Sequence, residues 1–182
     1  MKLLKFFVIL TLVLVCTNLV APSSFADSNY DPNKTSSVSE SVKLTPEEIE
    51  VLKANATVEN DFVSEPQSQL DRVTLSDVNT FDYSFSQLGS QREVKSYGTI
   101  DTSAKTDVYC TLTQKTALSN YSAYVMYLLE NTETGKRTPG KPVRGNVSET
   151  VGWSDVLPGN YRLVIVNMGE HETEGSGFVR AY

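Results

Sequence analysis

The chain is poor in the residues that build disulfide frameworks and zinc centres. It has two cysteines and one histidine in 182 residues, and Cys16 falls in an apolar N-terminal stretch. If that stretch is removed during export, Cys110 remains alone and no intramolecular disulfide can form. Zinc sites use several Cys or His ligands, which this composition does not supply. The processed chain must therefore be stabilised by burial of its hydrophobic core.

The sequence also lacks the short motifs of common catalytic and cofactor sites. It has no glycine-rich phosphate loop, no dinucleotide fingerprint, no zinc-protease helix and no Gly-x-Ser-x-Gly elbow. A catalytic cysteine needs a neighbouring base. Cys110 shares the parity of Val108 and Leu112 on a predicted strand, whereas His171 falls in a predicted loop. We therefore predict that the protein is not an enzyme and needs no cofactor.

Positive charge is scarce as well. Sixteen Lys and Arg face 22 Asp and Glu, so the net charge is −6. Nucleic acids and anionic lipids attract clustered Lys and Arg. The composition therefore predicts no nucleic-acid partner, and it predicts contact with a membrane only during export.

The N-terminus has the three parts of a secretory signal peptide. Lys2 and Lys5 precede the apolar run 6–15, and Ser24-Phe25-Ala26 offers small residues before Asp27. A membrane-spanning helix needs roughly 20 apolar residues, which this run does not reach. We predict cleavage between Ala26 and Asp27 and a secreted, extracellular protein. An uncleaved anchor and a lipid on Cys16 are the alternatives, and export without cysteine pairs favours a bacterial source.

Residues 27–78 are predicted to form a mostly disordered, flexible leader with one short helix. Serine-rich and otherwise polar sequence without large apolar groups buries too little surface to offset its ordering entropy. Within it, Thr45-Pro46-Glu47-Glu48 has an N-cap threonine, a proline at the first helical position and a glutamate at the third. These signals predict a helix over 46–55.

From residue 79 onward, apolar and polar residues alternate with the period of a β-strand. Phe81, Tyr83 and Phe85 share one parity, with polar residues between them. Further segments between Gly- and Pro-rich turns follow the same pattern, at 93–100, 106–113, 121–130, 143–153 (which a turn at Gly145 would break in two), 161–168 and 176–182. This spacing predicts an all-β fold, an antiparallel β-sandwich of the jelly-roll or immunoglobulin-like kind, over residues 79–182.

Two segments resemble those of bacterial pre-peptidase C-terminal domains, small β-sandwiches of secreted proteins. They are Tyr-Val-Met-Tyr-Leu-Leu-Glu-Asn at 124–131 and Leu-Pro-Gly-Asn-Tyr-Arg-Leu-Val-Ile-Val at 157–166. The resemblance implies a non-catalytic accessory or substrate-binding role. That family often carries an Asp-x-Asp motif before the first strand, and some of its members bind calcium, which leaves calcium as the alternative to the absence of a cofactor. Ser122 and Tyr124 stand at the matching positions here, which argues against calcium.

The segment 121–130 is apolar on both faces, so something must cover the face that lies outside the sandwich. One candidate is segment 45–78 folding back through its apolar residues Ile49, Leu52, Phe62, Val63 and Leu70. The other is a partner or a sugar stacked on Tyr109, Tyr124 and Trp153. Trp153 also shares parity with Val147 and Val151, which favours a core position.

An acidic loop near the C-terminus offers metal ligands. Glu170, His171, Glu172 and Glu174 bring oxygen and imidazole donors within five residues. Calcium prefers more oxygen ligands than these and zinc prefers more nitrogen or sulfur ligands, so a solvated loop is the alternative.

Taken together, the patterns predict a secreted, non-enzymatic binding or interaction protein. Its expected partner is an extracellular or cell-envelope polymer or protein, bound through a sheet face. The rival prediction is a small extracellular hydrolase, which would use two carboxylates at strand ends. The acids available to it are Asp101, Asp107, Glu149 and Asp155.

Overall fold

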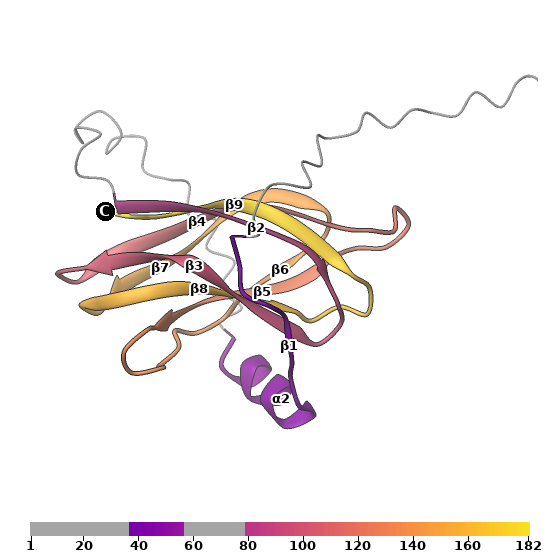
Figure 1. Cartoon of the computed structure of the whole chain (residues 1–182), viewed down its shortest axis with the longest axis horizontal. Helices are drawn as coiled ribbons and strands as arrows, with labels where there is room; N and C mark the ends of the chain where they lie inside the picture. The colour runs from indigo at the N-terminus through magenta and orange to yellow at the C-terminus, as the bar shows by residue number, and fades with distance from the viewer. Residues whose placement is uncertain (1–36, 57–78) are drawn as a thin grey trace, which may run out of the picture. The chain divides into compact units, whose positions relative to one another are not determined.

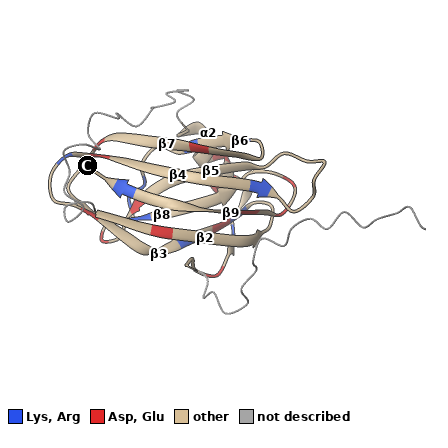
Figure 2. Ribbon diagram, turned by 90° about the horizontal axis from the view of Figure 1, so that it is seen from above, with Lys and Arg blue, Asp and Glu red and all other residues tan. Residues whose placement is uncertain are grey.

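A computed structural model describes residues 37–56 and 79–182, which form two β-sheets packed face to face with one short helix (Figure 1). In chain order the elements are β1 (Val42–Lys43), α2 (Pro46–Ala54), β2 (Asn79–Leu88), β3 (Arg92–Thr102), β4 (Thr106–Thr116), β5 (Tyr124–Asn131), β6 (Lys141–Arg144), β7 (Val147–Val156), β8 (Gly159–Asn167) and β9 (Thr173–Ala181). One sheet has the order β1-β3-β8-β5-β6 and the other the order β2-β9-β4-β7 (Figure 2). All pairings between these strands are antiparallel. The predicted antiparallel β-sandwich is confirmed.

The strands lie where the alternation placed them, with ends that differ by a few residues. The predicted segment 143–153 is indeed divided, into β6 and β7. Gly145 lies between these two strands with φ +102°, a conformation that glycine adopts without a steric penalty. The backbone can therefore turn sharply here and continue from the five-stranded sheet into the four-stranded one.

The inter-sheet core is built from the inward-facing residues of both sheets. Val108, Cys110 and Leu112 of β4 are at most 1% exposed, as their shared parity predicted. Cys110 Sγ lies 3.3 Å from Tyr83 Oη, and burial raises the pKa of this thiol to about 12. A thiol that stays protonated is a poor nucleophile, so Cys110 fills space in the core.

One polar side chain is buried in this core with all its groups paired. Gln114 is 1% exposed, and its Oε1 accepts a hydrogen bond from Tyr127 Oη at 3.0 Å. Its Nε2 donates to the carbonyl oxygens of Val143 and Gly145. Breaking these contacts would leave a buried amide unpaired, at a cost of about 1–3 kcal/mol. They therefore hold the end of β4 against the turn between β6 and β7.

A second, smaller core lies on the outer face of the five-stranded sheet, beneath α2 (Figure 1). Met126 and Leu128 of β5 and Val164 and Val166 of β8 pack there with Leu44 and Ile49. Leu52 packs against the same cluster. The second apolar face of β5 is thus covered by the chain itself, through Ile49 and Leu52; Phe62, Val63 and Leu70 lie outside the described residues.

The helix begins as its sequence predicted. Thr45 Oγ1 accepts from the backbone N–H of Glu48, and Glu48 Oε2 accepts from the backbone N–H of Thr45. This reciprocal capping box satisfies two backbone donors that a helix start leaves unpaired. Ile49 is the buried residue of α2, at 4% exposure.

Residues 37–44 correct the prediction of a flexible leader. Val38 is 6% exposed, and Ser39 N donates to the carbonyl oxygen of Lys95 at 2.7 Å. Strand β1 pairs with β3 through Val42 and Lys43. This polar segment gains order from backbone hydrogen bonds to the edge of β3, a non-local interaction that composition does not reveal. The predicted signal peptide 1–26 and the leader segments 27–36 and 57–78 lie outside the described residues.

Among the described elements, α2 is the only helix, and no helix there is long and apolar enough to cross a bilayer.

Candidate functional site

The strongest candidate site is a groove at one end of the sandwich, which we call the end groove. It has a volume of about 640 Å³, within the usual range for ligand sites. Its walls come from the β5–β6 loop, the last residues of β7, the β7–β8 turn and the start of β8. The lining residues are Asn131, Thr134, Lys136, Arg137, Thr138, Pro139, Lys141, Gly152, Trp153, Ser154, Asp155, Val156, Leu157, Pro158 and Tyr161.

Two aromatic side chains line the end groove from opposite sheets. Trp153 of β7 is 4% exposed, and its Nε1 donates to the carbonyl oxygen of Pro139 at 3.0 Å. Tyr161 of β8 is 8% exposed and belongs to the same core cluster. Both rings are therefore held rigidly, with only a small part of each open to the groove. Leu157 in the adjacent turn is 61% exposed and adds an accessible apolar surface.

The acidic residue of the groove is positioned by an unusual backbone conformation. Asp155 has φ +55°, which is uncommon outside glycine. Its N–H donates to Asp107 Oδ1 at 3.1 Å, and its carboxylate lies 3.6 Å from Lys105 Nζ. The register between β4 and β7 shifts at this place, which turns the end of β7 toward the groove.

Beside the end groove lies an ion cluster, which consists of Glu93, Lys95, Glu130, Arg137 and Arg162. Arg137, from the β5–β6 loop, donates two hydrogen bonds to Glu93 at 2.9 and 3.0 Å and one to Glu130 at 2.9 Å. Lys95 and Arg162 also donate to Glu130. The two glutamates are nearly buried, so their charges depend on these partners.

The pKa of the Glu130 carboxyl reflects this environment. Burial by itself would raise it, but the hydrogen bonds from Arg162, Lys95 and Arg137 lower the pKa to about 2. Glu130 is therefore ionised at neutral pH and unsuited to donate a proton. The cluster anchors the β5–β6 loop, whose other side chains line the end groove.

A second groove, of about 800 Å³, runs between α2 and the same loop. We call it the helix groove. Leu44, Val51 and Leu52 line it on one side, and Arg137 and Pro139 line it on the other. The two grooves share the stretch 137–139, so the anchored loop forms a wall between them.

The three aromatic residues predicted to bind a ligand do not come together. Trp153 lies in the core and contributes to the end groove. Tyr124 lies on the outer face of the five-stranded sheet, with the Arg144 guanidinium 3.9 Å from its ring centroid. Tyr109 lies on the outer face of the four-stranded sheet, where its ring packs at 5.7 Å against that of Tyr182. The structure therefore does not bring the three rings onto one face, and their role in ligand binding stays a prediction.

Tyr109 is buried although its ring lies on the outer face of its sheet. It is 7% exposed, and a Cβ atom at Gly152 would lie 3.1 Å from its ring. The ring thus lies over the backbone of β7, where a side chain larger than hydrogen would crowd it.

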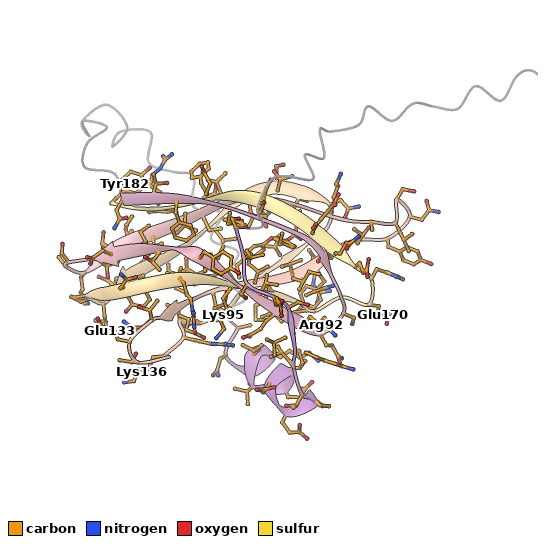
Figure 3. The ribbon with its side chains drawn as sticks, in the orientation of Figure 1. Arg92, Lys95, Glu133, Lys136, Glu170 and Tyr182 are labelled. Atoms are coloured by element: carbon orange, nitrogen blue, oxygen red, sulfur yellow. The ribbon has the colours of Figure 1, made fainter. Side chains whose placement is uncertain are left out.

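The four predicted metal ligands are also separated. Glu174 pairs with Lys115 at 3.0 Å, and the ring of His171 packs against Tyr121 at 3.7 Å between centroids. In the part of the chain that the structure describes, no group of three or more His, Cys, Asp or Glu side chains is placed to hold a metal ion. The expectation of a site formed by Glu170, His171, Glu172 and Glu174 is therefore not met. Glu170 lies at the end of the sandwich opposite to Glu133 and Lys136 (Figure 3).

Of the four carboxylates of the rival hydrolase prediction, Asp155 alone lines the end groove. Its contact with Asp107 runs from its backbone N–H to the Asp107 carboxylate and does not pair the two carboxyl groups. Asp101 of β3 lies opposite Asn160 of β8, and Glu149 of β7 lies opposite Leu112 of β4. Burial raises the pKa of Glu149. Within the described residues, no two of these acids line the groove as a hydrolase would require.

Several lining residues were missed by reasoning from the sequence. Lys136 lies in the β5–β6 loop and Lys141 begins β6, and Leu157 had been identified only as part of a turn. Their signal was weak: a loop of mixed charge, and one large apolar residue beside Pro158-Gly159. Loops carry binding residues more often than strands do, but no periodicity shows which loops meet in space.

Comparison with known proteins adds little to this geometry. No family model matches the chain, including any for pre-peptidase C-terminal domains, and no curated protein matches its sequence. Among solved structures, it is similar to the CBM22-1 xylan-binding domain of Paenibacillus barcinonensis Xyn10C, at 6% identity and a TM-score of 0.34 over 56% of this chain and 80% of that one. It is also similar to an exo-β-1,3-galactanase of Phanerochaete chrysosporium, at 13% identity and a TM-score of 0.34.

That second similarity covers 58% of this chain and 27% of the galactanase, so the chain spans about a quarter of that enzyme. At these identities the similarities concern the β-sandwich fold alone.

Proposed function

We propose that this protein is a non-catalytic binding module that holds a segment of an extracellular polysaccharide in the end groove. The observation that carries this proposal is the composition of the groove. It combines rigid Trp153 and Tyr161 rings and the accessible side chain of Leu157 with hydroxyl groups on Thr134, Thr138 and Ser154. Apolar surface with a few convergent polar groups is the usual character of a ligand site.

A sugar chain fits both kinds of surface. Its ring C–H groups present apolar patches that pack against aromatic and aliphatic side chains, while its hydroxyls exchange hydrogen bonds with serine and threonine. Because the aromatic rings are already fixed by the core and by the hydrogen bond to Pro139, binding requires little further ordering of the protein.

The same groove argues against the rival function. Glycoside hydrolysis uses two carboxyl groups on either side of the scissile bond. Among the described residues that line the end groove, Asp155 is the one acid, and it is paired with Lys105. The nearby Glu130 holds its proton too weakly to serve as a general acid, because its pKa is lowered to about 2.

The place of action is proposed on the sequence. The N-terminal segment has the basic, apolar and small-residue regions of a cleaved signal peptide. A polymer ligand outside the cell suits an exported module. The resemblance of 124–131 and 157–166 to pre-peptidase C-terminal domains implies an accessory role of the same kind.

The test compares two leucines that are exposed to a similar extent. Leu157 is 61% exposed and lines the end groove, whereas Leu118 is 51% exposed and lies in the β4–β5 loop. The purified protein is screened against a panel of soluble polysaccharides by affinity electrophoresis, and the affinity for each hit is measured by calorimetry. Leu157→Ala should weaken binding about fivefold, since an apolar contact worth about 1 kcal/mol is lost.

Leu118→Ala should bind as the unchanged protein does. A third variant, Ser154→Trp, places a bulky ring in the groove and should abolish binding while the circular dichroism spectrum stays that of a folded β-protein. The proposal is wrong if no polysaccharide binds, or if a bound polysaccharide is unaffected by both groove variants.

A further inference from the structure

We infer that the polymer bound in the end groove is anionic, with a negative charge on its repeating unit, and that Lys136 and Lys141 recognise that charge. This inference rests on the proposed function and specifies its ligand. It follows from the charges of the groove lining and from the partners of those charges.

Four charged residues line the end groove: Lys136, Arg137, Lys141 and Asp155. Two of them are already neutralised within the protein. The Arg137 guanidinium is bonded to Glu93 and Glu130, and the Asp155 carboxylate is paired with Lys105, which is not a lining residue.

Lys136 and Lys141 differ from these two residues. Neither is ion-paired with another residue in the described parts of the chain. Lys136 lies in the β5–β6 loop that the ion cluster anchors, and Lys141 is the first residue of β6. Lys136 is exposed at the tip of the β5–β6 loop, together with Glu133 (Figure 3). Glu133 does not line the groove, and its backbone N–H is bonded to the Asn131 side chain. The groove lining therefore carries two uncompensated positive charges.

This local charge is opposite to that of the whole protein. The chain carries a net charge of −6, and the helix groove is lined by three glutamates together with Lys43 and Arg137. Electrostatic interactions at physiological salt fade over about 8 Å, so a ligand in the end groove responds to the lysines that line it more than to distant acids. An acidic chain has no general attraction for polyanions, and any attraction must come from such a local site.

The ligand chemistry follows from the two types of contact. The apolar and hydroxyl surfaces suit a hydroxylated polymer, and lysine ammonium groups pair with carboxylate or phosphate as point charges. Polysaccharides with uronic acid units and polymers of polyol phosphate share this combination of hydroxyls and regular negative charge.

The experiment measures binding of the full chain to polygalacturonate, to poly(glycerol phosphate), to neutral xylan and to a single-stranded DNA oligonucleotide. Calorimetry is run at 50 and 300 mM NaCl with the unchanged protein, the double variant Lys136→Gln/Lys141→Gln and the control Lys115→Gln. Lys115 is a surface lysine paired with Glu174 on the four-stranded sheet, so its loss changes the net charge by one unit away from the groove.

We expect one of the two charged, hydroxylated polymers to bind at least tenfold more tightly than xylan or DNA. Higher salt should weaken that binding, and the double variant should lose most of both the preference and the salt dependence. The Lys115→Gln variant should bind as the unchanged protein does. Preference for one polymer over the other identifies the anion as carboxylate or phosphate.

The inference is overturned if xylan binds as tightly as the charged polymers and the double variant changes nothing, while Leu157→Ala still weakens binding. In that case the groove binds a neutral polysaccharide and the proposed function survives. The inference is also overturned if DNA binds as tightly as the charged, hydroxylated polymers. In that case the groove would recognise negative charge alone and not the hydroxyl groups of the polymer. Absence of binding to xylan and to both charged polymers overturns both proposals.

Discussion

The outer face of the five-stranded sheet is covered in two different ways along the same strand. On β5, Met126 and Leu128 lie under α2, and two residues further on the same face Glu130 lies among three cations. The apolar part is covered by a segment from far away in the chain. The charged part is covered by Arg137, which belongs to the hairpin that β5 itself begins.

This difference separates two functions of one surface. Burial under α2 is non-directional and tolerates small shifts, because it depends mainly on the apolar area removed from water. The ion cluster depends on the placement of each donor and acceptor, and it fixes the loop that forms the wall of the end groove. Damage to the cluster is therefore expected to cost more stability, and to disturb ligand binding more, than damage beneath the helix.

The largest effect is expected from Glu130→Ala. The substitution leaves Lys95, Arg137 and Arg162 close together with Glu93 as the remaining acid, so the free energy of unfolding should fall by about 4 kcal/mol. Urea denaturation followed by tryptophan fluorescence measures this change. Glu133→Ala, on the exposed part of the same hairpin, should change stability by less than about 0.5 kcal/mol. Equal stability of the two variants would show that the cluster is not coupled to folding.

A smaller effect is expected from Leu128→Ala, beneath the helix. The lost side chain leaves a cavity, but α2 can settle into part of it, so the expected loss is about 2–3 kcal/mol. Hydrogen exchange should show faster opening of α2 while the strands of the four-stranded sheet stay protected. Val51→Ala provides the control, because Val51 is 59% exposed on the same helix. Uniform loss of protection over both sheets would contradict the separation of the two cores.

Acid should lower the stability that the ion cluster contributes before it affects the apolar contacts beneath α2. The pKa of Glu130 is lowered to about 2 in the folded state, so its contribution to stability is present above the ordinary pKa of a glutamate. That contribution should be lost as the pH falls from about 4.5 toward 2, because the unfolded chain binds the proton more readily. Glu130→Gln should flatten this part of the stability profile measured by urea denaturation. An unchanged slope would mean that other carboxylates dominate the acid response.

The smallest effect is expected from Thr45→Ala. It removes the hydrogen bond that Thr45 Oγ1 accepts from the backbone N–H of Glu48. Loss of such an N-cap bond costs about 1 kcal/mol in typical helices. Because α2 is tied to the sheet by few side chains, the loss should appear as increased exchange within residues 46–54. Thermal unfolding of the β-sandwich should shift little, and a large shift would show that the helix is integral to the main core.

The sequence predicted the local features of this protein, but few of the contacts between residues far apart in the chain. Alternation in β4 predicted that Cys110 is buried, and Thr45, Pro46 and Glu48 predicted where the helix begins. Both signals act between residues a few positions apart. The order at residues 37–44 was missed because it depends on hydrogen bonds to β3, about 50 residues further along the chain.

The candidate site was predicted even less completely. Trp153 was recognised, but it was grouped with Tyr109 and Tyr124, which the sheets place on other faces. Lys136, Lys141 and Leu157 were not recognised, since a loop residue has no periodicity that reveals its neighbours.

The amino-acid pattern alone determined that this chain forms strands, which side of each strand is apolar and where the helix starts, because these depend on spacing along the backbone. Only the tertiary structure decided which strands are neighbours. The order β3-β8-β5 brings Glu93, Arg162 and Glu130 together and thereby fixes the β5–β6 loop beside Trp153. A groove lined by lysines is the product of that non-local pairing, and no segment of the chain contains it.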